Sequence, residues 1–171
     1  ISIGRLVDNK NHLMLLKAIN LLEEKEKIAL VIIGEGKNRK LLINYANKIK
    51  FRNLYIFNYK KNPYPYLLNS DLKILTSNFE GLPNVLIEAM ALNKPIISTN
   101  SPTGPREILL NGKAGFLIKR NDFKSLSSKI QLFLKNPKLF NKKKLFYKES
   151  LKRFSPENSL KKYADIVDDI I

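Results

Sequence analysis

The residues of this sequence best suited to chemistry lie in the segment 77–90, where the end of an apolar strand passes through a glycine turn into a helix. Pro83 fits the first helical turn because it lacks only an amide hydrogen that would be unpaired there. The amides of Asn84 and Val85 are then free to face a ligand. Because a helix N-terminus favours negative charge, the segment predicts a site for an anion such as a phosphate group.

Two carboxylates flank this helix start, Glu80 just outside it and Glu88 about one and a half turns inside. Gly81 permits a positive φ and a close approach of the backbone to a ligand. Each carboxylate can accept paired hydrogen bonds from vicinal hydroxyls, one pair on a sugar ring and the other on a ribose. Taken singly, Glu80 is better explained as a capping carboxylate and Glu88 as a solvated helix residue. The spacing of both with Gly81 and Pro83 favours a binding site.

A second group of polar residues, 4–12, follows the first apolar strand and leads into the first helix. Arg5 and Lys10 are cations on this loop, which in a parallel sheet lies on the same rim as the Glu80 loop. Together they can neutralise one diphosphate, the arginine through two hydrogen bonds and the lysine as a point charge. His12, the only histidine, is interpreted as a capping or packing residue. With one histidine and no cysteine, no metal site is expected.

Two further loops also follow predicted strands and lead into helices. Residues 34–36 form a strand-to-helix turn that is either a plain turn or the border of a nucleoside site, and they lack the last glycine of a dinucleotide fingerprint. The loop 101–107 follows another strand and predicts Arg106 as a further phosphate or sugar contact.

Strand-like and helical patterns alternate along the chain. Strands are predicted at 28–33, 54–57, 72–75, 95–98 and 116–118, and helices near 13–22, 41–49, 85–92, 123–134, 137–151 and 156–171. This alternation predicts an α/β fold, a Rossmann-like doubly wound parallel sheet flanked by helices. Ligands of such sheets bind at the carboxyl ends of the strands, which is where the polar loops above are expected.

Composition narrows the class of protein. The 171 residues suit a single domain, and the absence of cysteine fits a reducing, cytoplasmic setting. A net charge of +16 is explained equally well by an anionic partner and by a lysine-rich composition. The densest lysine cluster, 142–144, makes a peripheral contact with the inner face of the cell membrane a secondary hypothesis. The sequence begins abruptly within an apolar strand, and this predicts that it is a piece of a longer protein.

These motifs, taken together, resemble the GT-B glycosyltransferases of family 4, retaining enzymes with a Glu-x7-Glu motif. The resemblance covers nearly the whole chain. It rests on Gly-Arg-Leu and Lys at 4–10, Phe57-Asn58-Tyr59, the block from Glu80 to Glu88, Lys94-Pro95-Ile96-Ile97, and the segment 112–117. Two positions depart from the family pattern, since Tyr59 and Asn11 replace common glycines.

The resemblance implies that residues 1–171 are a carboxy-terminal domain that binds a nucleotide sugar. An amino-terminal domain, absent from this sequence, would bind a glycan or lipid-linked acceptor. Arg5 and Lys10 would bind the diphosphate and, with Glu80, form the catalytic set. Glu88 would bind the ribose. The expected donor-binding set is completed by Gly4, Tyr59, Gly81, Leu82, Pro83, Asn84, Val85 and Arg106.

The resemblance also implies a mechanism. Transfer would retain the anomeric configuration, with the leaving phosphate oxygen taking the acceptor proton, so neither a protein general base nor a metal or other cofactor would be required. The loop 100–107 resembles that of bacterial enzymes that build surface glycans from UDP-hexoses or UDP-N-acetylhexosamines. The isolated domain is expected to be inactive, and the location cytoplasmic or peripheral at the membrane.

Two other functions compete with this interpretation. A non-catalytic basic module that binds nucleic acid or an anionic membrane would explain the charge, but it leaves Glu80 and Glu88 without a role, so nucleic acid is not an expected partner. Another GT-B-type enzyme, such as an epimerase, would turn over the donor without an acceptor.

Overall fold

The computed structural model describes residues 1–168, without the side chains of 161–163 and 166–168. Six parallel strands form two groups: β1 (Ser2–Ile3), β2 (Leu30–Ile33) and β3 (Leu54–Phe57), then β4 (Lys73–Leu75), β5 (Ile96–Thr99) and β6 (Phe116–Ile118). The backbone amide of Ile74 donates to the carbonyl of Ile1 at 2.9 Å and so joins β4 to the chain entering β1. The strands therefore run in the order 3-2-1-4-5-6, the order of Rossmann sheets.

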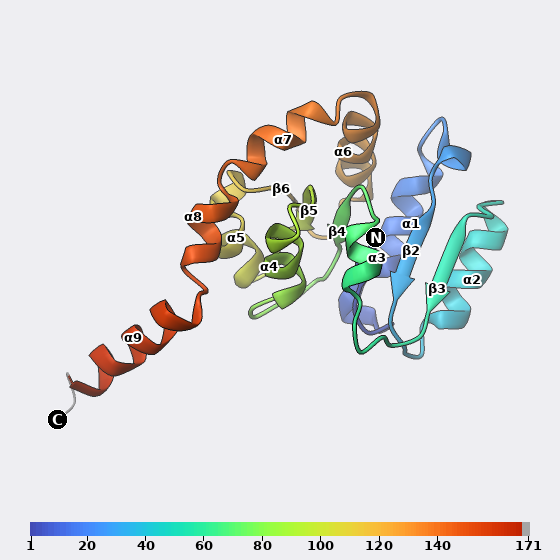
Figure 1. The fold of residues 1–171 in the computed structure, drawn as a ribbon. Helices are drawn as coiled ribbons and strands as arrows, with labels where there is room; N and C mark the ends of the chain where they lie inside the picture. The colour runs from blue at the N-terminus through green and yellow to red at the C-terminus, as the bar shows by residue number, and fades with distance from the viewer. Residues whose placement is uncertain (169–171) are drawn as a thin grey trace.

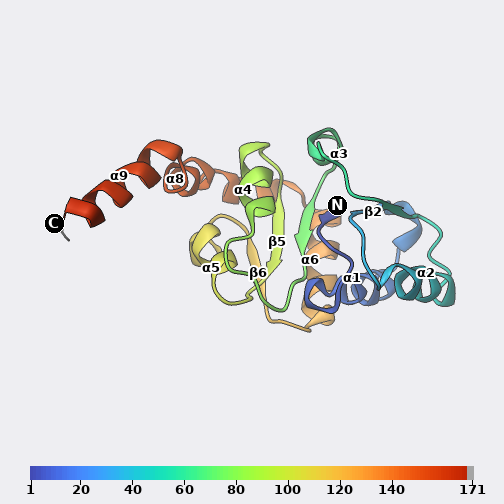
Figure 2. The same ribbon diagram turned by 90° about the horizontal axis from the view of Figure 1, so that it is seen from below.

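Helices cover both faces of the strands (Figures 1 and 2). On one face, α1 (His12–Asn20), α2 (Arg39–Lys48) and α6 (Phe123–Lys135) bury apolar side chains against Ile32, Ile74 and Ile97. On the other, α3 (Tyr64–Leu68), α4 (Asn84–Ala91) and α5 (Gly104–Ile108) pack on Ile33, Leu75 and Ile96. Successive strand residues therefore point alternately into two cores, one on each face, as a doubly wound sheet requires. The prediction of this fold class is confirmed.

The predicted elements agree with the structure within one or two residues for the strands, and the short α3 was not predicted. The single helix predicted over 137–151 is wrong, because the chain forms α7 (Lys138–Lys144) and α8 (Tyr147–Lys152) instead. Phe140 is buried in the core beneath α1 and α6, whereas Tyr147 is buried in the core beneath α4. One straight helix cannot bury side chains in the cores on both faces of the sheet, so the chain turns at residues 145–146.

The last helix, α9 (Pro156–Asp168), extends away from the sheet (Figures 1 and 2). Leu160, on this helix, is 70% exposed. The predicted end of the helix, residues 169–171, lies outside the described residues. Within residues 1–168, no helix is long and apolar enough to cross a membrane.

Candidate functional site: a cation and a carboxylate at the switch point of the sheet

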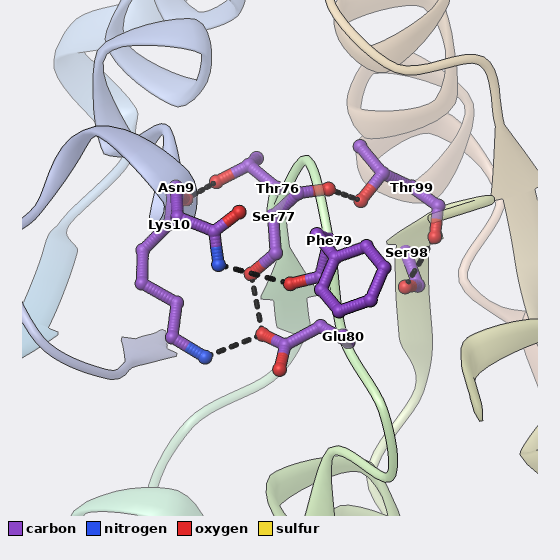
Figure 3. Close-up of polar contacts among 8 residues, drawn as sticks. All are labelled: Asn9, Lys10, Thr76, Ser77, Phe79, Glu80, Ser98 and Thr99. Atoms are coloured by element: carbon purple, nitrogen blue, oxygen red, sulfur yellow. Dashed lines mark hydrogen bonds and ion pairs between the residues drawn. The ribbon is translucent and has the colours of Figure 1, made fainter. Parts of the chain in front are cut away.

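The candidate site lies where the strand order reverses, between β1 and β4. After β1 the chain forms the short 3-10 helix η1 (Asp8–Lys10), and after β4 it forms the Glu80 loop. Lys10 Nζ lies 2.5 Å from Glu80 Oε1, and Ser77 Oγ donates to the same oxygen at 2.6 Å (Figure 3). The two side chains are only 21% and 11% exposed, so this ion pair is shielded from bulk water. The prediction that the two loops share one rim is confirmed.

Further hydrogen bonds hold these two loops together (Figure 3). The Thr76 hydroxyl donates to the carbonyl of Lys10 at 2.8 Å, and the Asn9 amide group donates to the carbonyl of Phe79 at 3.0 Å. The backbone amide of Asn78 donates to the carbonyl of Asn9 at 2.8 Å. The position of Lys10 relative to Glu80 is therefore set by the backbone before any ligand binds, which is what electrostatic catalysis requires of its charged groups.

The loop after β5 supports the Glu80 loop from its other side. The Glu80 amide donates to the carbonyl of Pro102 at 2.9 Å, and the Thr103 amide donates to the carbonyl of Glu80 at 2.6 Å. Gly104 is required here, because a Cβ at this position would lie 2.0 Å from the carbonyl oxygen of Gly81. Glu80 is thus fixed between two neighbouring loops.

The start of α4 offers backbone amides to this rim. The helix begins at Asn84, so Pro83 caps it with an extended backbone instead of lying in its first turn, one residue from the predicted place. No side chain caps the helix. Among the described residues, no backbone acceptor bonds the amides of Asn84 and Val85. These amides are free to meet an anion, as the sequence predicts.

Gly81 contributes open space to the site. The sequence permits a positive φ at Gly81, but the residue does not use this freedom, since the glycines of the described chain with a positive φ are Gly4, Gly34, Gly36 and Gly112. Instead, a Cβ built on Gly81 meets nothing within 4 Å. The missing side chain therefore leaves open space beside Glu80, next to the start of α4.

The remaining predicted residues lie around this centre. Arg5 and Tyr59 are exposed, and the amide of Tyr59 donates to Glu35 Oε1 at 3.2 Å, which links the turns after β2 and β3. Leu82 is 50% exposed on the Glu80 loop. Arg106 is also exposed and lines a cleft of about 580 Å³ beside the β5 loop, not the Lys10–Glu80 pair itself.

Two buried basic groups lie behind the pair. His12 is 4% exposed, and burial, with the nearby charges of Lys73 and Lys10, lowers its pKa to about 4. It is neutral at physiological pH and packed into the core, in agreement with the packing role predicted for it. Lys73, on β4, was missed by the sequence analysis. It is completely buried, and the carboxylates that favour its charged form are Glu88, half-buried on α4, and to a smaller extent Glu80.

The part of the chain that the structure describes contains no cluster of three or more histidine, aspartate or glutamate side chains arranged as metal ligands. The polar groups gathered at the switch point are instead a cation, a carboxylate and unpaired helix amides. Such a set can bind an anion and hydroxyl groups at the same time.

A Rossmann-like sheet of six parallel strands, with a cation, a carboxylate and free helix amides at its switch point, has the architecture of nucleotide-binding domains. Residues 1–153 match the family described as "Glycosyl transferases group 1", and the chain belongs to this family. An uncharacterized glycosyltransferase of Methanocaldococcus jannaschii is 41% identical over 111 residues, which cover 64% of this chain and 27% of the relative.

Two further similarities extend over more of the chain. The N-acetylgalactosamine-N,N'-diacetylbacillosaminyl-diphospho-undecaprenol 4-alpha-N-acetylgalactosaminyltransferase of Campylobacter jejuni is 30% identical over 140 residues, 81% of this chain and 38% of the relative. The crystal structure of Anabaena HepE in complex with UDP superposes with a TM-score of 0.88 at 18% identity, covering 98% of this chain and 48% of HepE. The chain thus spans less than half of each of these proteins, and the likeness to HepE shows the fold.

Proposed function

We propose that this chain is the donor-binding domain of a retaining glycosyltransferase. The enzyme transfers a hexose or N-acetylhexosamine from a UDP-sugar to a glycan or lipid-linked acceptor in bacterial surface polysaccharide synthesis. The observation that carries the proposal is the shielded Lys10–Glu80 pair beside the free amides at the start of α4. A nucleic-acid site has no use for a carboxylate at its centre, because Glu80 would repel phosphates.

The charges of the site suit a nucleoside diphosphate sugar. The donor diphosphate carries two negative charges, and Arg5 and Lys10 supply two cations on one loop. Lys10 lies at the buried end of the loop and Arg5 at its exposed end, so both ends of a diphosphate can be bound. These cations stabilise the charge that develops on the leaving diphosphate, and no metal is needed for that role.

The carboxylates suit the hydroxyl groups of the same donor. Glu80 and the amides of Gly81, Leu82 and Asn84 position the donor sugar, which occupies the open space at Gly81. Glu88 accepts the ribose hydroxyls, and the base lies along the Tyr59 loop. The leaving phosphate oxygen takes the acceptor proton, so the site needs no general base, and the buried, neutral His12 does not act as one.

The relatives support this choice of substrates by what their names and titles state. The Campylobacter relative is named for a diphospho-undecaprenol acceptor, and HepE is crystallised with UDP. Because these proteins are longer than this chain, the acceptor site is proposed to lie in an amino-terminal domain outside residues 1–171. Nucleotide sugars are made in the cytoplasm, and the enzyme is proposed to work there.

A peripheral contact with the membrane, at the turn between α7 and α8, is a secondary part of this proposal. Leu145, at the turn between them, is 80% exposed beside Lys142, Lys144 and Lys148. An exposed leucine among lysines suits an anionic bilayer. Flotation of the full-length protein with vesicles containing an anionic phospholipid tests this contact, and a Leu145→Ser variant is expected to bind them less than the wild type.

The donor-site proposal is tested by calorimetric titration of the full-length protein with UDP, GDP and UDP-sugars in the absence of metal. UDP binding is expected, and Glu88→Ala is expected to weaken it, whereas the control Glu23→Ala, an exposed residue beyond α1, is not. Absence of UDP binding from the folded protein would contradict the proposal. Strong, salt-sensitive nucleic-acid binding would favour the basic module, and donor turnover without acceptor would favour an epimerase.

A further inference from the structure

The structure buries a lysine behind the proposed donor site. Lys73, the first residue of β4, is 0% exposed, and its Nζ has no hydrogen-bond partner in the described chain. A buried lysine without a partner is rare, because burying an ammonium group costs several kcal/mol. The strand would accept an apolar residue here, since Lys73 lies on the same face as Leu75, which packs beneath α4.

The charged groups around Lys73 belong largely to the proposed donor site. The ionisable groups that interact electrostatically with it are Lys10 on η1, His12 on α1, Glu80 after β4, Glu88 on α4 and the amino group of Ile1 before β1. The two carboxylates stabilise its charged form, Glu88 more than Glu80, whereas Lys10 opposes it. His12 is neutral above pH 5 and adds no charge.

We infer that Lys73 is a positioning residue of the donor site: it takes up a proton when a nucleoside diphosphate binds, and its ammonium then holds Glu88 for the ribose. This inference rests on the proposed function. The reason is electrostatic, since a bound diphosphate draws Lys10 toward itself and adds two negative charges to the cluster for a UDP-sugar, or three for ionised UDP. Both changes favour the ammonium form of Lys73 over the amine.

Lys73 is able to take up a proton near neutral pH. Burial lowers its pKa to about 7, so near neutral pH a large fraction of the amine is unprotonated. At pH 8 about 10% of Lys73 is charged before binding, and a rise of one pKa unit on binding would take up about 0.4 of a proton. A rise of one pKa unit makes UDP binding about fivefold weaker as the pH goes from 7 to well above the bound-state pKa.

The test is titration of the full-length protein with UDP at pH 8 in two buffers of different ionisation enthalpy, which gives the number of protons taken up. Wild type is expected to take up about 0.4 of a proton or more per UDP, and its affinity is expected to fall between pH 7.5 and 8.5, where the UDP phosphates are ionised and the uracil is still neutral. Lys73→Met is expected to lose both effects. Lys17→Met, at an exposed position on α1, is expected to keep them.

The outcomes separate this inference from the proposed function. Binding of UDP to the wild type without proton uptake overturns the role of Lys73 and leaves the donor site standing. The same proton uptake in Lys73→Met also overturns it. If the folded wild type binds no UDP, the donor-site proposal and this inference fail together.

Discussion

Replacing Lys73 by methionine should make this protein more stable. Lysine has a pKa of 10.5 in the unfolded chain and, because of burial, about 7 in the folded protein. Each pKa unit corresponds to about 1.4 kcal/mol, so the buried ammonium costs about 5 kcal/mol at low pH and about 4 kcal/mol at pH 7. Methionine has a similar length, needs no partner and fills the same space between β4 and α4.

The pH dependence of this gain has a definite sign. Between pH 7 and 10.5 the unfolded chain binds the Lys73 proton and the folded protein does not, so the free energy of unfolding of the wild type rises with pH over this range. The cost of Lys73 is fully present below pH 7 and disappears as the pH approaches 10.5. The advantage of Lys73→Met should therefore shrink from about 4 kcal/mol at pH 7 to about 1 kcal/mol at pH 9.5.

Urea denaturation followed by circular dichroism at pH 6.5, 7.5, 8.5 and 9.5 measures this difference for wild type and Lys73→Met. Lys17→Met, at an exposed position, should change stability by less than about 0.5 kcal/mol at every pH. The reasoning is refuted if Lys73→Met is less stable than wild type at pH 7, or if its advantage is the same at all four values. Either result would mean that the ammonium is satisfied in the folded protein.

Three further predictions concern the site itself. Lys10→Met removes the partner of Glu80 and should lower kcat/KM for the UDP-sugar about 10²-fold or more in the full-length enzyme, with Lys17→Met as the matched control. Gly104→Ala places a Cβ against the backbone of the Glu80 loop and should cost about 2 to 4 kcal/mol of stability in urea denaturation; a change below about 0.5 kcal/mol would show that the loop adapts. Gly81→Ala meets no protein atom and should leave the urea midpoint unchanged but raise KM for the UDP-sugar, whereas an unchanged KM would mean that the donor does not occupy this space.

The sequence predicts the fold and the centre of the site well, because both follow from local patterns. Alternation of apolar runs and helical periods indicates a parallel sheet, and the carboxyl ends of its strands share an edge. That rule alone brings Lys10 and Glu80 to the same rim, although they are 70 positions apart in the chain. The rule does not say which atoms meet, and Ser77, the second partner of Glu80, was not predicted.

The errors arise where tertiary packing decides the local structure. Helical periodicity continues through residues 137–151, but the helix breaks because Phe140 and Tyr147 are buried in different cores. The sequence shows that Gly81 permits a positive φ, but only the structure shows that its missing side chain leaves open space. Neither the break in the helix nor the open space at Gly81 can be predicted from neighbouring residues in the sequence alone.

Lys73 shows how the two kinds of information combine. In the sequence it is one charged residue within the predicted strand 72–75, in a chain so basic that a single lysine carries no signal. In the structure its Nζ is completely buried and unpaired, at a cost of about 4 kcal/mol at pH 7 that methionine would avoid. Functional sites are where such costs persist, because a group that is unfavourable alone becomes favourable when the ligand arrives. If Lys73→Met proves more stable but loses the pH dependence of UDP binding, stability and donor binding place opposite demands on this position.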